Sequence, residues 1–283
     1  MRDTNFEVRL MTPSEVGIAT EWAAAEGWNP GLHDAQCFYR ADPSGFLIGL
    51  LDGVPIAIIS AVKYSSSFGF IGFYIVKPGY RGNNYGPLIG KAALEYLKGC
   101  NVGLDGVVEK QSNYKSLGFK MAYRNIRYQG LGGGAFPANT SIVRHEAIPF
   151  EELCKYDKPF FPALRSDFLK CWVEQPQSAA FGILDNGKVA GYGVIRTCNS
   201  GFKIGPLFAD TPEYAELLFL ALKSFATNES PVFLDVPEIN SDAVALATRH
   251  KMTISFETAR MYTGPFPDLP LDRLYGVTSF EIG

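Results

Sequence analysis

The stretch Tyr74–Leu88 has the residue types and the order of an anion-binding loop. An apolar run ends in small and polar residues, and an amphipathic segment begins directly afterwards, at about Tyr85. This arrangement directs the free backbone N–H groups of a helix N-terminus toward one point, where the helix dipole favours a phosphate group. Gly82 and Gly86 allow close approach to the backbone, and Arg81 adds positive charge. Small polar turns also precede helices without any ligand, so the loop alone leaves both interpretations open.

The loop belongs to the first of two similar stretches of sequence. Gly49–Ala57 resembles Gly182–Ala190 at a shift of 133, and Leu104-Asp105 matches Leu234-Asp235 at a shift of 130. Such a repeat predicts two units of one architecture, although any two strand–turn–strand units share part of the likeness. We expect a first copy over residues 1–130, a glycine-rich linker over residues 131–141 and a second copy over residues 142–283.

Each copy is expected to be of the α+β class, with a mixed, mostly antiparallel sheet flanked by helices in three layers. Thr12 and Pro13 suit the start of a helix, and Asp52-Gly53 is a strong hairpin signal. In the first copy the pattern predicts strands over 6–11, 45–51, 56–64, 68–76, 102–108 and 120–128, and helices over 13–26, 85–98 and 113–117. In the second it predicts strands over 180–184, 189–196, 202–208, 232–236 and 253–261, and helices over 213–226 and 241–250.

The composition argues against several classes of protein. The 283 residues carry 26 Lys and Arg against 29 Asp and Glu, without a basic block, which argues against nucleic-acid binding. The apolar stretch over residues 46–62 is too short and too interrupted to span a membrane. Five scattered cysteines and three distant histidines show no metal-ligand spacing. Because the N-terminus lacks a signal-peptide pattern, we expect a cytoplasmic protein without a metal, nucleic-acid or membrane partner.

Taken in order, these features resemble the GNAT family of acyl-CoA-dependent N-acetyltransferases. The segment Val76–Gly82 fits the pattern Val-x-Pro-x-Tyr-Arg-Gly, and Arg81–Gly86 is a loop of the family's Arg-x-x-Gly-x-Gly type. About thirty residues later, Tyr114–Phe119 matches the Tyr-x-x-x-Gly-Phe signature. The resemblance covers roughly residues 6–128. Asn84 stands where the family has glycine, and asparagine tolerates the left-handed backbone better than most residues.

The resemblance implies acetyl-CoA as the co-substrate and assigns residues to it. The diphosphate is expected at Arg81, Gly82, Asn83, Asn84, Tyr85 and Gly86. The pantetheine is expected along the backbone of Tyr74, Ile75 and Val76, with a backbone N–H near Ile75 as the donor to the thioester carbonyl. Asn113 is expected either to bond the pantetheine amides or to cap the short helix. Tyr114 is expected to protonate the departing thiolate, since a phenol donates a proton without carrying charge at rest; packing beneath the coenzyme is the alternative role.

The general base is less defined by the sequence. Asp105 lies on a buried strand, but its counterpart Asp235 persists in a copy without a phosphate loop, which favours a structural carboxylate. Glu109 follows that strand and is the candidate base, with Glu26 and Asp34 as alternatives. Ordered water could also carry the proton.

The segment after the first predicted helix lines the acceptor pocket in the family. Here it offers Glu26, Trp28, Asn29 and Asp34, a combination that suits a cationic amine with an apolar body. The alternative is a helix stop followed by a turn, with Trp28 packed in the core.

The second copy resembles a non-classical GNAT domain. Where the phosphate loop should be it has Thr211–Glu216, whose two carboxylates would repel a diphosphate, so we expect a non-catalytic unit.

The sequence thus predicts an enzyme that transfers an acetyl group to a primary amine of a small molecule by direct attack in a ternary complex. The alternatives are a catalytically silent acyl-CoA sensor or scaffold, and a peptide or protein acyl- or aminoacyltransferase. A monomer and a homodimer are both compatible, and the copies could pack within one chain or exchange across a dimer.

Overall fold

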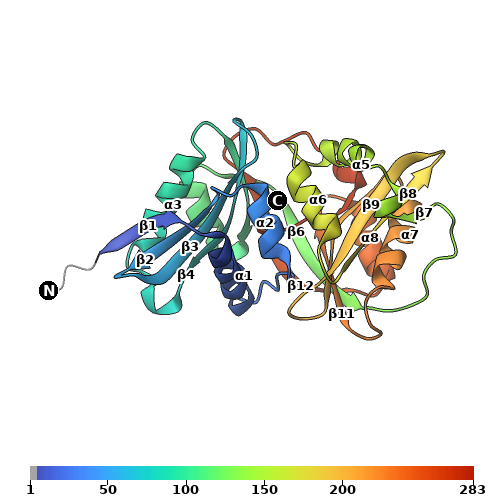
Figure 1. The fold of residues 1–283 in the computed structure, drawn as a ribbon, viewed down its shortest axis with the longest axis horizontal. Helices are drawn as coiled ribbons and strands as arrows, with labels where there is room; N and C mark the ends of the chain where they lie inside the picture. The colour runs from blue at the N-terminus through green and yellow to red at the C-terminus, as the bar shows by residue number, and fades with distance from the viewer. Residues whose placement is uncertain (1–4) are drawn as a thin grey trace.

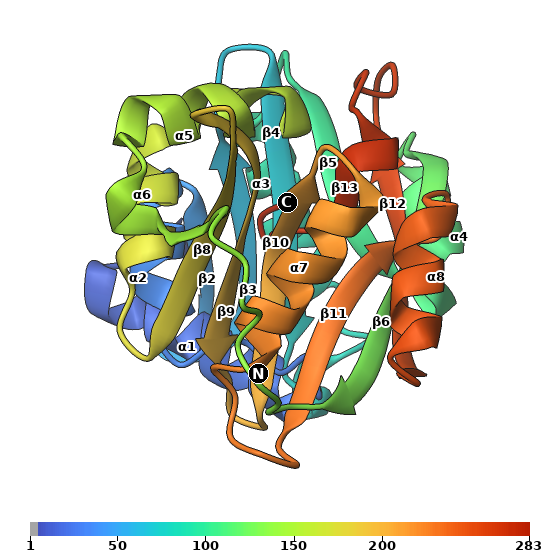
Figure 2. The same ribbon diagram turned by 90° about the vertical axis from the view of Figure 1, so that its right-hand side faces the viewer.

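One mixed sheet of thirteen strands runs through the molecule, in a computed structural model that describes residues 5–283 (Figures 1 and 2). The first copy forms β1 (Phe6–Leu10), α1 (Val16–Ala25), α2 (Asp34–Ala41), β2 (Phe46–Leu51), β3 (Val54–Lys63), β4 (Phe68–Val76), α3 (Tyr85–Tyr96), β5 (Asn101–Val107), α4 (Gln111–Ser116) and β6 (Lys120–Leu131). The second forms β7 (Ile142–Arg144), α5 (Phe150–Asp157), α6 (Ser166–Glu174), β8 (Ser178–Asp185), β9 (Lys188–Thr197), β10 (Phe202–Ala209), α7 (Pro212–Lys223), β11 (Pro231–Pro237), α8 (Ser241–Arg249), β12 (Thr253–Tyr262) and β13 (Leu274–Gly276). The predicted α+β class is confirmed.

The predicted elements with strong local signals are present. Strand β4 has the predicted bounds, and a capping box at Thr12 and Glu15 precedes α1. Asp52 and Gly53 both have positive φ, 50° and 81°, which is the turn that a two-residue hairpin requires between β2 and β3.

Three helices and two short strands were not predicted. Helices α2, α5 and α6 have eight or nine residues each. Their N-cap residues, His33, Pro149 and Arg165, make no side-chain capping bond. Strands β7 and β13 have three residues each. Short elements without capping residues have little local signal, so tertiary packing decides them.

The two copies exchange their closing strands within one chain. The strand order is β1-β2-β3-β4-β5-β12-β6-β11-β10-β9-β8-β7, with β13 beside β10. Strand β12 of the second copy therefore pairs with β5 of the first, from Thr258 opposite Val107 to Tyr262 opposite Gly103. Strand β6 of the first copy pairs with β11 of the second. Of the two arrangements left open by the sequence, packing within the chain is correct, and it includes an exchange.

A buried ion pair crosses each exchanged junction. Arg127 on β6 makes two bonds to Asp235 on β11, of 2.7 and 2.8 Å, and Arg260 on β12 makes two to Asp105 on β5, of 2.9 and 2.6 Å. Asn125 adds a 2.8 Å bond to Asp105. The pairs are equivalent in the repeat, because the shifts that relate the two copies also relate Arg127 to Arg260 and Asp105 to Asp235. Asp105 therefore has the structural role that an aspartate at the equivalent position of both copies indicates.

The two aspartates differ in electrostatic setting. Burial raises the pKa of Asp105 above its ordinary value, and the attraction of Arg260 only partly offsets this. Burial also acts on Asp235, but Arg127, together with Lys203 and Arg196, outweighs it and lowers the pKa of Asp235.

The core between the copies is built by four helices that face one another. Helix α2 packs against α6 between the two wings of the sheet, β1–β5 and β7–β11, with α1 beside α2 and α5 beside α6. Helix α3 covers the outer face of one wing, and α7 and α8 cover the outer face of the other (Figure 1). Phe38 of α2 stacks on Trp172 of α6 with ring centroids 5.7 Å apart. Asp34 and Arg196 form a further buried pair between the copies, at 2.8 Å.

Replacing Arg127 by alanine should lower the free energy of unfolding by about 3–5 kcal/mol, because the buried Asp235 loses its bidentate partner. Arg124→Ala on the same strand is the matched control: its pairs with Glu238 and Glu257 are exposed to solvent, which screens them, so its loss should cost far less. Urea denaturation measures both. Because the pKa of Asp235 is lowered on folding, its contribution is complete above the ordinary aspartate pKa and is lost as the pH falls below it. Equal costs for the two variants would contradict this assignment.

Candidate active site

The loop between β4 and α3 has the backbone geometry that an anion site needs. Asn84 precedes α3 with φ of 65°, so asparagine adopts the left-handed conformation expected at this departure from the family pattern. Gly82 has φ of +83°, and a Cβ atom there would meet nothing within 4 Å, so the space beside it is open. Helix α3 is twelve residues long, and the first backbone N–H groups of a helix have no partner within it. The residues present therefore fit a diphosphate.

Arg81 is held in the loop by two partners. Its Nε donates to the carbonyl oxygen of Val76 at 2.7 Å, and its guanidinium pairs with the carboxylate of Glu26. Glu26, one of the predicted acceptor residues, thus lies at the phosphate loop. Asn83 lies in the same turn, with Nδ2 3.4 Å from the carbonyl oxygen of Tyr80.

The strands beside the loop separate where the thioester arm of the coenzyme is expected. The parallel ladder between β4 and β5 runs from Phe68 opposite Asn101 to Ile71 opposite Leu104, while β4 continues to Val76. A bulge lies at the point of separation, because β4 carries one extra residue opposite β3 and Phe73 has φ of 47°. Bulges of this kind reorient the backbone beside a site.

The predicted coenzyme residues Tyr74, Ile75 and Val76 lie on the separated part of β4. The Tyr74 ring lies under α3, where a Cβ atom on Gly86 would be 3.1 Å from its hydroxyl. Ile75 points to the opposite face, into the core between the copies. The Lys77 N–H bonds the Ile56 carbonyl of β3 at 2.9 Å, so the Ile75 N–H also faces β3, and the N–H groups that alternate with it face the edge that β5 leaves.

Tyr114 on α4 lies at the other side of this separation. Its ring packs over Gly106 of β5, where a Cβ atom would be 2.5 Å from the ring, and its phenol is near enough to that of Tyr74 for the two ionisations to affect each other. Burial, with a smaller contribution from Tyr74, raises the pKa of Tyr114 to about 12, so the phenol is protonated at neutral pH. The structure therefore brings Tyr74, Gly86 and Tyr114 to one region of the sheet.

The other predicted catalytic and coenzyme residues near Tyr114 are exposed. Asn113 begins the last turn of α4, where its backbone carbonyl accepts a 2.7 Å bond from Ser116. Glu109 lies in the short 3₁₀ turn after β5. Neither makes a side-chain hydrogen bond within residues 5–283.

The structure does not gather the four predicted acceptor residues around a common space. Asp34 is fully buried in its pair with Arg196, and Asn29 bonds the backbone of Ser200 in both directions at 2.9 Å. The carbonyl oxygen of Trp28 accepts a 2.7 Å bond from Arg127. These residues hold the copies together, and that role was not expected because each partner lies far away in sequence.

The equivalent separation in the second copy is filled by the chain itself. The ladder between β10 and β11 ends at Ile204 opposite Leu234, the positions equivalent to Ile71 and Leu104. Beyond that point β13 pairs with β10, and the Val277 N–H bonds the Asp235 carbonyl at 2.9 Å (Figure 2). The sequence analysis missed this strand. It also missed Arg260, although the shift that relates Gly49 to Gly182 also relates Arg127 to Arg260 and was a usable signal.

Comparison with known proteins agrees with the geometry. Residues 15–119 match the acetyltransferase (GNAT) family, and residues 153–276 match a second acetyltransferase (GNAT) domain. A protein from Pseudoalteromonas sp. (strain SANK 73390), named holothin acyltransferase, is 30% identical over 266 residues, which is 94% of this chain and 90% of that protein. The chain belongs to the GNAT family of acyltransferases, as an enzyme with two GNAT domains in tandem.

Solved structures share the fold over nearly the whole chain. A putative acetyltransferase from Pyrococcus horikoshii superposes with a TM-score of 0.83 at 23% identity, over 98% of this chain and 96% of that one. A tandem GNAT protein from the clavulanic acid biosynthesis pathway gives a TM-score of 0.63 at 13% identity, over 93% of this chain and all of that one. At these identities the likeness shows the fold.

Between residues 5 and 283, no group of three or more His, Cys, Asp and Glu side chains is arranged to hold a metal ion. No helix in this part of the chain has both the length and the apolar composition needed to cross a membrane.

Gly82→Glu should abolish binding of acetyl-CoA, measured by calorimetry, because the added carboxylate lies in the open space beside the helix N-terminus and repels a diphosphate. Gly82→Ala is the matched control, since it imposes the same strain at positive φ without the charge, and it should weaken binding far less. Unchanged affinity in Gly82→Glu would show that the diphosphate binds elsewhere.

Proposed function

We propose that the first copy transfers an acetyl group from acetyl-CoA to a primary amine of a small molecule, by direct attack in a ternary complex. The observation that carries this proposal is the junction of β4, its bulge and α3, with Tyr114 across the separated strands. Acetyl-CoA supplies a thioester as the acyl donor. The chain's own residues then have to hold the donor, polarise its carbonyl and stabilise the leaving thiolate.

Each of these tasks has a candidate group. The N-terminus of α3, with Gly82, Asn83 and the side chain of Arg81, would hold the diphosphate. A backbone N–H of β4 near Ile75, on the edge freed by the separation from β5, would donate to the thioester carbonyl. Tyr114 would donate its proton to the departing thiolate, and its raised pKa keeps the phenol protonated until the thiolate forms.

Glu109 remains the proposed base for the acceptor amine. It lies directly after β5, on the same side of the separation as Tyr114, and it is exposed. An exposed carboxylate can accept a proton from an ammonium group and pass it to solvent.

The choice of a small-molecule acceptor is supported by the relatives. The protein that is 30% identical is named for acyl transfer to holothin, and one structural neighbour comes from a biosynthetic pathway for clavulanic acid. We therefore favour a small amine over the alternative of a peptide or protein acceptor.

We further propose that residues 142–283 form a unit that does not bind acetyl-CoA. Two observations support this: β13 occupies the separation between β10 and β11, and Glu213 lies in the first turn of α7. Glu216, expected to add a second charge there, is instead paired with Arg249 and His250. On this proposal the glycine-rich linker over residues 131–141 connects a catalytic unit to one that completes its sheet.

Calorimetry with acetyl-CoA should therefore give one site per chain. The same protein should release coenzyme A thiol from acetyl-CoA when a suitable primary amine is present in a panel of small amines and peptides. Two sites per chain would contradict the non-catalytic assignment of the second copy. Release with peptides alone would favour the peptide acceptor, and binding without release across the panel would contradict catalysis.

Tyr114→Phe should lower kcat about 100-fold, the typical contribution of a general acid, and leave the Kd of acetyl-CoA unchanged. Because the pKa of Tyr114 is about 12, the parent enzyme should show no loss of rate from its deprotonation below about pH 10. Tyr214→Phe on α7 controls for loss of a hydroxyl elsewhere. An unchanged kcat would leave Tyr114 with a packing role only.

A further inference from the structure

The last residues of the chain are buried in the middle of the molecule. From Val277 to Ile282 each residue is at most 8% exposed, and the chain end lies between the two wings of the sheet in both views (Figures 1 and 2). We refer to Val277–Gly283 as the C-terminal segment.

The C-terminal segment contacts equivalent glycines in both copies. A Cβ atom on Gly205 of β10 would lie 2.5 Å from the carbonyl oxygen of Val277 and 2.8 Å from that of Thr278. A Cβ atom on Gly72 of β4 would overlap the carbonyl oxygen of Glu281 and lie 2.7 Å from its carbonyl carbon. Gly72 and Gly205 are related by the shift that relates the two copies, so the segment crosses from one copy's strand to the matching place on the other.

Hydrogen bonds fix the segment on the first copy. The Tyr64 hydroxyl donates to the carbonyl oxygen of Ile282 at 2.9 Å, and the Ser60 hydroxyl to that of Glu281 at 3.3 Å. Arg165, itself paired with Asp157, lies 3.4 Å from the carbonyl oxygen of Gly283.

The segment lies on the face of β4 opposite α3. Tyr74 and Val76 point toward α3, next to Gly86, whereas Gly72 faces Glu281. Gly72 also directly precedes the bulge at Phe73. If the diphosphate is held at α3 and the acyl end passes between β4 and β5, the acyl group emerges on the face that the segment covers. An attacking amine has to approach from that face.

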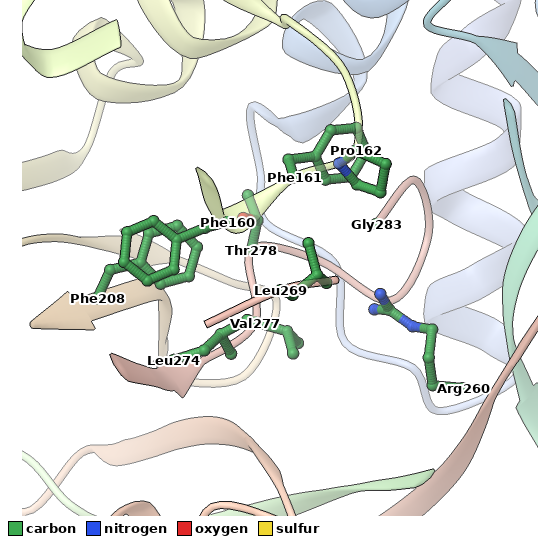
Figure 3. Close-up of a pocket in the computed structure, with 10 residues that line it drawn as sticks. All are labelled: Phe160, Phe161, Pro162, Phe208, Arg260, Leu269, Leu274, Val277, Thr278 and Gly283. Carbon is green, nitrogen blue, oxygen red and sulfur yellow. The ribbon is translucent and has the colours of Figure 1, made fainter. Parts of the chain in front are cut away.

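The space beside the segment is small. A cavity of about 20 Å³, enough for one water molecule, lies next to it between the copies. Figure 3 shows Phe160 and Phe208 together at one end of this cavity and Arg260 at the other, with Thr278 and Gly283 also in its lining. The segment therefore leaves room for little more than one water molecule beside it.

We propose that Glu281–Gly283 form the acceptor-side wall of the first copy's active site, which limits the acceptor to a compact amine and keeps water from the thioester. This role rests on the proposed function, because it requires the acyl group at the β4 bulge. With this wall, residues at the end of the second copy help to determine which acceptors the first copy uses.

Two substitutions outside the coenzyme site test this role by loosening the wall. Gly205→Ala places a methyl group against backbone atoms of Val277 and Thr278, so the segment has to shift. Tyr64→Phe removes one anchoring hydroxyl with little change in shape. Gly17→Ala on α1 is the control, because a Cβ atom there meets nothing within 4 Å.

The readout is release of coenzyme A thiol from acetyl-CoA in phosphate buffer without any amine. In this reaction water attacks the thioester carbonyl, the carbon–sulfur bond breaks, and acetate and the thiol form. Both variants should raise the rate about fivefold, equivalent to about 1 kcal/mol, while the Kd of acetyl-CoA and the control's rate stay at the parent values.

Rates equal to the parent's in both variants, with acetyl-CoA bound and a cooperative thermal transition retained, would overturn this role. Tyr64→Phe keeps the test valid if Gly205→Ala does not fold. Failure of the unaltered chain to bind acetyl-CoA would overturn the proposed function, and this role with it, and that result is distinct from an unchanged rate.

Discussion

Two buried arginine–aspartate pairs join the copies where their strands are exchanged, and the rest of the molecule depends on them. Each pair ties a closing strand of one copy to the fifth strand of the other, so neither sheet is complete within its own stretch of sequence. A charge taken out of water needs its partner at full contact, and both pairs are bidentate. The second copy thereby supplies the strand that pairs with β5 on the edge away from β4.

The repeat gives a symmetric scaffold on which the two sites differ. Equivalent residues end the ladder between the parallel strands in each copy, at Ile71 with Leu104 and at Ile204 with Leu234. Beyond that point the first copy has Tyr74 and Tyr114 at the separation, and the second has β13. Pseudo-symmetry therefore explains the fold, and the path of the chain after β12 explains why a strand fills the separation in the second copy and not in the first.

Local structure could be predicted from the sequence, and long-range partners could not. The bounds of β4, the hairpin at Asp52 and the left-handed Asn84 follow from neighbouring residues alone. The partners of Asn29 and Asp34 lie in the other copy, far along the chain. The polarity of these two residues therefore suggested contacts with a substrate, whereas in the structure they make contacts between the copies. The sequence did contain a signal for the exchange, because the shift that relates the repeats also relates Arg127 to Arg260.

The exchange also sets the order in which the protein can mature on the ribosome. The native neighbour of β5 is β12, which is the last long strand of the chain, so the first copy leaves the exit tunnel with that edge unsatisfied. Until β12 is synthesised, β6 is the nearest strand able to cover it, in a pairing that the finished molecule does not contain. Folding therefore requires either that a provisional contact between β5 and β6 opens, or that the chain waits in a state prone to association until β12 is made. Both cases favour slow, chaperone-assisted folding.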